Sequence, residues 1–273
     1  MKTAIIDIRT PNEAERALLK LGFSVLRAPP SKKLPAPLAS HPDMLMCIIG
    51  KTLVSSADYV DEALTLFDDL AHQTALNFTV TADEFGDVYP RDCIFNALTV
   101  GKRLFCKTDS VSPSVIEVAR RQGFKTVHVN QGYPACTVLP LGDGAAITAD
   151  KGMARVLERE GIDVTLIENG GISLPPYEYG FIGGAAGVFD GRVYFLGDPE
   201  KHACADLILG AVERAGLRAV SLIDSPLLDL GRILFADQSV DDHDGARDQQ
   251  YSENAEQRIR SEKQNEADYG MEP

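Results

Sequence analysis

The sequence predicts an α/β fold in which five ββαβ modules form a five-bladed propeller, closed by pairing between the two ends of the chain. Three repeated features predict it: an amphipathic segment that ends at a glycine, an apolar strand before it that ends in a capping residue, and a further strand upstream. The rival fold is an open doubly wound sheet. That fold lacks hairpins between paired strands, so the glycine-containing turns of this sequence disfavour it.

Each module contains one predicted helix followed by one strand. Glycine commonly follows a helix because it adopts the left-handed conformation at little cost. A short strand comes directly after each of these segments. The predicted helical copies are residues 16–22, 118–123, 156–161 and 212–216, with a weaker copy at residues 66–80 in which Asn77 stands in place of glycine.

A strand hairpin is predicted before each helix. The second strand of the hairpin ends in a polar residue that can accept hydrogen bonds from the first helical turn. These capping residues recur at spacings of about 41 to 51 residues and are Thr10, Asp58, Asp109, Asp150 and Asp198. The tight turns of the hairpins contain Gly50, Gly101, Gly142 and Gly191. A lead-in segment starts each module, and the five lead-ins are residues 41–43, 89–92, 133–136, 177–180 and 226–229.

The two ends of the chain predict how the modules close. Residues 1–28 supply a strand, a helix and a strand, whereas residues 225–236 supply only a lead-in and a strand. Pairing of these ends completes the fifth module and removes exposed sheet edges. We therefore predict a propeller domain over residues 1–236. Residues 237–273 carry 11 acidic and 4 basic side chains with few apolar ones, which predicts an acidic, disordered tail.

The composition excludes several classes of function. No apolar run approaches the roughly 20 residues of a membrane helix, and no secretion signal is recognised, so we expect a cytoplasmic protein. A formal net charge of −13 repels phosphate groups, so nucleic acid is not an expected partner. The five cysteines form no C-x-x-C pair and the histidines are dispersed. We therefore expect free thiols, no metal site and no cofactor.

Five modules of this kind resemble the pentein, or guanidino-group-modifying, fold of arginine deiminase, dimethylarginine dimethylaminohydrolase and amidinotransferases. The resemblance covers residues 1–236. It implies a hydrolase or transferase of the deiminase or amidinohydrolase type, directed at a guanidino or amidine group. The segments His41-Pro42-Asp43, Tyr89-Pro90-Arg91-Asp92, 131–137 and 179–187 also resemble those of an uncharacterised bacterial family that is associated with this fold.

The lead-in segments are predicted to line one central pocket, because equivalent positions of a ring meet at the same end of its axis. A cationic guanidino ligand needs carboxylates to hold it, a thiolate to attack its carbon and a histidine to move protons. We predict Cys136 as the nucleophile, His41 as the base and Asp92 as an orienting carboxylate. The predicted substrate-binding residues are Asp43, Tyr89, Arg91, Asn96, Tyr133, Tyr177, Glu178 and Asp229.

A non-catalytic function stays open as the alternative. Pentein enzymes carry their nucleophilic cysteine in the last module, where this chain has Asp229, and Tyr133 and Tyr177 stand where their histidine is expected. Cys136 can equally be a small buried side chain, and His41 can belong to a surface turn. The alternative is a pentein that binds a small, amino-acid-like ligand or a protein partner. The sequence does not decide whether the chain is an enzyme or how many copies assemble.

Overall fold

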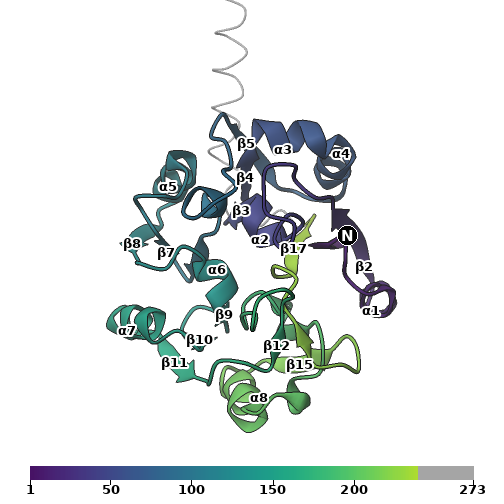
Figure 1. Cartoon of the computed structure of the whole chain (residues 1–273), viewed down its shortest axis with the longest axis vertical. Helices are drawn as coiled ribbons and strands as arrows, with labels where there is room; N and C mark the ends of the chain where they lie inside the picture. The colour runs from purple at the N-terminus through teal and green to yellow at the C-terminus, as the bar shows by residue number, and fades with distance from the viewer. Residues whose placement is uncertain (239–273) are drawn as a thin grey trace, which may run out of the picture. The chain divides into compact units, whose positions relative to one another are not determined.

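A repeated three-stranded sheet organises the computed structural model, which describes residues 1–238 (Figure 1). Within those residues, five such sheets share one topology. The middle strand pairs antiparallel with one neighbour and parallel with the other. A helical crossover precedes the parallel partner, since a parallel pair cannot be joined by a tight turn. The predicted order of strands and helices, and the mixed α/β fold, are therefore confirmed.

One sheet joins the two ends of the described chain. Its elements are β17 (Leu234–Asp237), β1 (Lys2–Asp7), α1 (Asn12–Lys20) and β2 (Phe23–Ala28). β17 pairs antiparallel with β1, from Lys2 opposite Asp237 to Ile5 opposite Leu234. In Figure 1 the yellow-green β17 lies close to the purple N-terminal segment. The predicted pairing of the end segments is confirmed, and β17 reaches one residue beyond the predicted boundary at residue 236.

The other four three-stranded sheets follow one another along the chain. The second unit has α2 (Pro42–Leu45), β3 (Met46–Ile49), β4 (Thr52–Ser56), α3 (Ala57–Glu62), α4 (Leu64–Gln73) and β5 (Asn77–Thr81). The third has η1 (Arg91–Cys93), β6 (Leu98–Val100), β7 (Arg103–Cys106), α5 (Pro113–Arg121) and β8 (Lys125–His128). The fourth has α6 (Pro134–Thr137), β9 (Val138–Pro140), β10 (Ala145–Thr148), α7 (Lys151–Arg159) and β11 (Asp163–Leu166).

The fifth unit has β13 (Ala186–Phe189), β14 (Arg192–Phe195), η2 (Pro199–Lys201), α8 (Ala205–Arg214) and β15 (Arg218–Ser221). A small parallel sheet of β12 (Ile172–Ser173) and β16 (Leu227–Leu228) adds to it. This extra pair holds two loops that contribute to the site described below.

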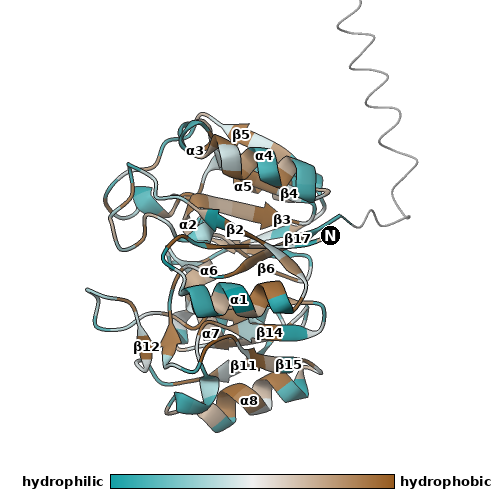
Figure 2. Cartoon of the chain, turned by 90° about the vertical axis from the view of Figure 1, so that its right-hand side faces the viewer, coloured by the Kyte–Doolittle hydropathy of each residue, from teal (hydrophilic) through white to brown (hydrophobic). Residues whose placement is uncertain are grey.

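The longer helices α1, α3, α4, α5, α7 and α8 lie on the outside, whereas the first strands of the units and the short helices α2 and α6 lie nearer the centre (Figure 1). Strand β9 contacts β6 and β13, and β13 contacts β17. Helix α1 buries Ala14 and Leu18 against its sheet and keeps its charged side chains outside. Figure 2 shows this pattern as mixed teal and brown on α1 and α8. The core therefore lies between the helices and their sheets, and the inner strand ends remain available to build a site.

Helix capping differs from the prediction in three units. Asp150 caps α7 as predicted, accepting hydrogen bonds from the amides of Gly152 at 2.7 Å and Met153 at 3.0 Å. Ser56 and Ser112 cap α3 and α5 instead of the predicted aspartates, and Pro11 precedes α1. The two aspartates do not stand at the N-cap positions, because α3 starts immediately after β4, whereas α5 starts only after a further turn. The predicted aspartates, Asp58 and Asp109, form ion pairs with lysines.

Residues 239–273, which contain almost all of the predicted acidic tail, lie outside the described residues. In the part of the chain that the structure describes, none of the helices is long and apolar enough to cross a membrane. All five cysteines are free thiols, as the sequence predicts.

Candidate functional site

A cavity of about 390 Å³ opens where the lead-in segments of several units meet. Six of the predicted site residues line it: His41, Tyr133, Cys136, Tyr177, Glu178 and Asp229. Its other lining residues are Leu38, Met44, Leu174, Tyr179 and Phe181. The cavity thus combines two carboxylates, one thiol and one imidazole with a mostly apolar and aromatic wall, which is the usual make-up of a small-molecule site.

Two short helices place the polar groups on the floor of the cavity. α2 and α6 each consist of four residues and begin at a proline, which is preorganised for the first helical position. Cys136 of α6 donates from Sγ to Oδ2 of Asp43 of α2 at 3.0 Å. Nδ2 of Asn96 lies 3.0 Å from the same sulfur and donates to the carbonyl of Asp43 at 3.1 Å. The predicted residues Asp43, Asn96 and Cys136 therefore form one hydrogen-bonded cluster.

Burial keeps the Cys136 side chain in its thiol form. Burial, together with the carboxylates of Asp43 and Asp229, raises the pKa of Cys136 well above that of a free cysteine. Burial also raises the pKa of Asp43, although the hydrogen bond from the thiol and the charge of Arg232 act in the opposite direction. A cationic ligand in the cavity would favour ionisation of both groups, because it stabilises negative charge.

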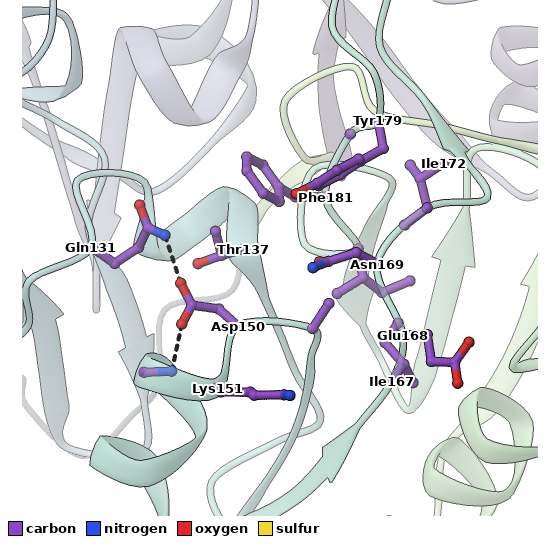
Figure 3. Close-up of a pocket in the computed structure, with 15 residues that line it drawn as sticks. Gln131, Thr137, Asp150, Lys151, Ile167, Glu168, Asn169, Ile172, Tyr179 and Phe181 are labelled. Carbon is purple, nitrogen blue, oxygen red and sulfur yellow. Dashed lines mark hydrogen bonds between the residues drawn. The ribbon is translucent and has the colours of Figure 1, made fainter.

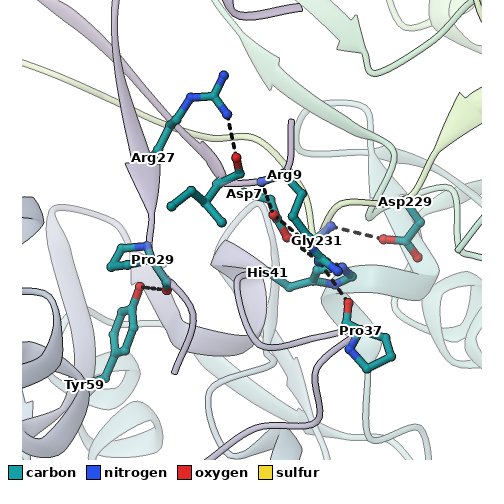
Figure 4. Close-up of polar contacts among 10 residues, drawn as sticks. Asp7, Arg9, Arg27, Pro29, Pro37, His41, Tyr59, Asp229 and Gly231 are labelled. Carbon is teal, nitrogen blue, oxygen red and sulfur yellow. Dashed lines mark hydrogen bonds and ion pairs between the residues drawn. The ribbon is translucent and has the colours of Figure 1, made fainter. Parts of the chain in front are cut away.

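His41 does not pair with Cys136, which corrects the predicted arrangement of nucleophile and base. The thiol bonds to Asp43 instead, and neither ring nitrogen of His41 has a hydrogen-bond partner within residues 1–238. Nε2 of His41 lies 3.9 Å from Oδ2 of Asp7, which is held in turn by Arg9 (Figure 4). Burial lowers the pKa of His41 to about 4, so the imidazole is neutral near neutral pH. The prediction of a surface turn is also wrong, because His41 is fully buried.

Asp229 lies in the segment that leads into β17, in the sheet that joins the two ends of the described chain. Its Oδ2 accepts from the amide of Phe181 at 2.8 Å, and its Oδ1 accepts from the amide of Gly231 at 3.1 Å. Burial is the main cause that raises the pKa of Asp229 to about 7. Gly180 and Gly184 make room for it, since a Cβ at either position would approach the aspartate to within 2.4 Å or less. The glycine cluster therefore serves close packing around a carboxylate.

Five predicted site residues do not line the cavity: Asp43 and Asn96, which contact Cys136, and Asp92, Tyr89 and Arg91. Asp92 is buried on η1 and accepts from the hydroxyl of Tyr133 at 2.7 Å, so it orients a wall residue and does not face the ligand space. Tyr89 and Arg91 are exposed. Tyr89 contacts Tyr133 through their rings, whose centroids are 5.7 Å apart. The single turn of η1 directs Asp92 and Cys93 inward and leaves Arg91 at the surface, which the lead-in pattern alone could not predict.

Sequence reasoning missed Asp7, Arg9 and Arg232. Arg9 donates to both carboxylate oxygens of Asp7, with Nε to Oδ1 at 2.9 Å and Nη2 to Oδ2 at 2.5 Å. Arg232 bonds to the backbone on either side of Cys136. Asp7 ends β1, which pairs antiparallel with β17, so it lies at the end of the sheet where the chain enters β17. The position of Arg232 depends on the backbone turn at Gly231, which has no sequence signature beyond the glycine.

A second cavity of about 540 Å³ lies across Tyr179 and Phe181, which line both spaces. Gln131 donates to Asp150 at 2.7 Å on one side of it, and Asn169 lies opposite (Figure 3). It contains neither cysteine nor histidine. Among residues 1–238, no group of three or more His, Cys, Asp or Glu side chains could hold a metal ion.

Gly231, in the segment that leads into β17, shows how closely this segment approaches His41. Its φ is +72°, and a Cβ there would lie 2.2 Å from Cβ of His41. We expect Gly231→Ala to lower the free energy of unfolding by about 3 kcal/mol, because left-handed strain and overpacking add. Gly22→Ala is the matched control, since Gly22 has φ +87° with nothing within 4 Å, and should cost only about 1 kcal/mol. Urea unfolding of both variants tests this, and equal losses would contradict the close packing.

Comparison with known proteins identifies the fold. A model of a family of unknown function (DUF6873) matches residues 5–234. A sequence comparison with curated proteins gives no match. The solved structures that resemble the chain are pentein enzymes, so the predicted resemblance is confirmed at the level of fold.

Three of these solved structures show how low the sequence identity is and how much of each chain is covered. Dimethylarginine dimethylaminohydrolase from Pseudomonas aeruginosa, a cysteine-to-serine mutant with citrulline, is 12% identical, with TM-score 0.51 over 82% of this chain and 91% of that one. A cysteine-to-serine mutant of agmatine deiminase from C. jejuni, with substrate bound, is 5% identical. Its TM-score is 0.54 over 88% of this chain and 94% of that one. ArgZ, a cyanobacterial arginine dihydrolase, is 12% identical, with TM-score 0.51 over 89% of this chain and 40% of that one.

Proposed function

We propose that this chain, which belongs to a family of unknown function (DUF6873), is a guanidino- or amidine-directed hydrolase or transferase that acts through Cys136. One observation carries the proposal: the Cys136 thiol, hydrogen-bonded to Asp43 at 3.0 Å, lines a cavity that also contains Asp229 and several aromatic rings. We further propose that the five three-stranded sheets are the blades of a closed propeller with this cavity on its axis.

The cavity wall suits a cationic, planar ligand. Asp229 and Glu178 provide negative charge, and Tyr133, Tyr177 and Phe181 provide aromatic surface for cation–π contact. The mutant dimethylarginine dimethylaminohydrolase binds citrulline, and the mutant agmatine deiminase binds its substrate. These neighbours support a small guanidino compound or its ureido analogue as the ligand class.

The proposed reaction uses Cys136 as nucleophile and Asp43 as its acid and base. The sulfur attacks the guanidino carbon and forms a C–S bond while the thiol proton passes to Asp43. Asp43 returns this proton to the departing nitrogen as the C–N bond breaks. Water then attacks the same carbon, Asp43 carries the proton of the water to the leaving sulfur, and the last proton of the ureido product goes to solvent. An amine in place of water gives group transfer.

A non-catalytic binding function is the second candidate. The specific observation in its favour is that, within residues 1–238, the Cys136 thiol bonds to Asp43 and to no imidazole, and its pKa is raised well above its ordinary value. A thiol that rarely ionises is a poor nucleophile. Under this alternative the cavity would still bind the same class of ligand, and only turnover would be absent.

The experiment that separates the two candidates measures binding and turnover on the same samples. Agmatine and citrulline are titrated into the full chain by calorimetry, and release of ammonia or amine from agmatine is followed. We expect saturable binding together with slow product release. Binding without any release would support the binding module, and absence of binding for both compounds would contradict the proposed ligand class.

Asp229 should make binding depend on pH. Its pKa of about 7 means that it is largely protonated at pH 6 and ionised at pH 8. Only the ionised carboxylate attracts a cation, so the affinity for agmatine should fall about tenfold from pH 8 to pH 6, with proton release on binding. Calorimetry in two buffers measures both the affinity for agmatine and the proton release. Asp229→Asn should remove the pH dependence and Glu178→Gln should retain it, whereas a flat wild-type profile would contradict the role of Asp229.

A further inference from the structure

Arg232 is a charged side chain that the proposed reaction does not use, and it contacts the turn that carries Cys136. Its Nη2 donates to the carbonyl of Ala135 at 2.8 Å and to the carbonyl of Val138 at 2.7 Å. These two carbonyls stand on either side of Cys136 and Thr137 in the chain. One guanidinium therefore fixes the junction between α6 and β9 at the thiol.

The surrounding packing leaves this junction little freedom. Gly183 packs directly on it, since a Cβ there would lie 2.4 to 2.6 Å from the carbonyl oxygens of Ala135, Cys136 and Val138. The amide of Gly184 also donates to the carbonyl of Cys136 at 3.1 Å. The turn is thus held by Arg232 and by the glycine cluster of the neighbouring unit.

The backbone of Arg232 has a conformation that side chains seldom adopt. Its φ is +61°, directly after Gly231 at +72°. A non-glycine residue persists in this region when surrounding contacts impose it, and such residues concentrate at functional sites. Here the contacts are the two hydrogen bonds from the guanidinium and one from the Arg232 amide to the carbonyl of Gly184 at 2.9 Å. The guanidinium is therefore held against the backbone segment that carries Cys136.

The charge of Arg232 acts on the same groups that the reaction needs. Burial raises the pKa of Asp43, and the charge of Arg232 opposes this increase. Burial lowers the pKa of Arg232, whereas Asp43 and Cys136 act to raise it. Its Nε atom is buried and has no hydrogen-bond partner within residues 1–238. Within residues 1–238, the ionisable groups around Cys136 or in its cavity are Asp43, Asp229, His41, Glu178, Arg232 and the tyrosines Tyr133, Tyr177 and Tyr179. Of these, Arg232 is the group that carries a positive charge at neutral pH.

We propose that Arg232 is the positioning residue for Cys136: it fixes the turn that carries the thiol and supplies the positive charge that stabilises the thiolate. The inference rests on the proposed role of Cys136 and deepens it by naming the cation that stands in for a histidine beside the sulfur. His41 is excluded from this task because it has no hydrogen bond to the thiol and is neutral.

The test is the pH profile of Cys136 alkylation by iodoacetamide between pH 6 and 10, read by peptide mass spectrometry. Arg232→Met and Arg232→Gln remove the charge, and Arg232→Lys keeps it. We expect both neutral variants to shift the profile upward by at least about one pH unit, which is at least about a tenfold lower rate at pH 8. Arg232→Lys should stay within about threefold of the wild-type rate, because the charge is retained.

Controls separate this effect from a loss of structure. The other four cysteines are buried, so their alkylation reports unfolding in each variant. If Arg232→Met exposes them, Arg232→Gln carries the comparison, because its amide is an uncharged hydrogen-bond donor. His41→Asn should leave the profile unchanged. Neutral variants with the wild-type profile, or a larger shift in His41→Asn, would overturn the inference. Failure to bind guanidino compounds would instead overturn the proposed function, since alkylation requires no such ligand.

Discussion

Replacing Cys136 by serine should abolish turnover of guanidino compounds while leaving their binding nearly intact. The hydroxyl can still donate to Asp43, so the cluster with Asn96 should keep its geometry. An unactivated hydroxyl is a far weaker nucleophile than a thiolate, so we expect turnover to fall at least about a thousandfold. The affinity measured by calorimetry should change less than about threefold, because the carboxylates and rings that hold the ligand remain.

Cys204→Ser is the matched control for this variant. Cys204 is also buried and free, but it packs in the cluster around α8 and does not line the cavity. Its replacement should leave turnover within about twofold of wild type. Turnover that persists in Cys136→Ser would remove the thiol from the mechanism.

Replacing Asp43 by asparagine should change two properties of the site in opposite directions. The carboxylate of Asp43 contributes to the raised pKa of Cys136, so a neutral amide should lower that pKa. Alkylation of Cys136 at pH 8 should then become several-fold faster. Turnover should fall at least about a hundredfold, because the amide cannot accept the thiol proton or return it to the leaving nitrogen.

Because alkylation should become faster while turnover becomes slower, general damage to the fold cannot produce the same result. A merely destabilised protein would lose turnover and would also expose the other cysteines to alkylation. Asp58→Asn serves as the control, because Asp58 pairs with Lys33 at the surface, away from the cavity. A parallel fall in alkylation and turnover in Asp43→Asn would contradict the assignment of Asp43 as the base.

Much of the fold could be predicted from the sequence because its signals repeat. The turn glycines, the helix-ending glycines and the incomplete modules at both ends indicate the same architecture independently. Pairing of β1 with β17 was predictable, since neither end alone could complete a three-stranded unit. Helix capping was less predictable, because a nearby serine can replace an aspartate when the helix starts one turn earlier or later, as at Ser56 and Ser112.

The candidate site was predictable in its location but only partly in its contacts. The common phase of the lead-ins identified Cys136, His41 and Asp229 as residues of one cavity. The partner of Cys136 was not predictable, because the direction of each side chain depends on a single turn of helix in α2 and α6. Arg232 was missed for a different reason, since its position comes from two successive left-handed backbone conformations that hydropathy patterns do not report.

The measurement that tests the central claim most directly is a search for a covalent adduct on Cys136 during turnover. The full chain is mixed with a guanidino compound, quenched in acid after short intervals, digested and analysed by peptide mass spectrometry. We predict a mass increase on the Cys136 peptide equal to the bound amidino group, absent in Cys136→Ser. Product formation without any adduct in the wild type, or an equal adduct on another cysteine, would contradict nucleophilic attack by Cys136.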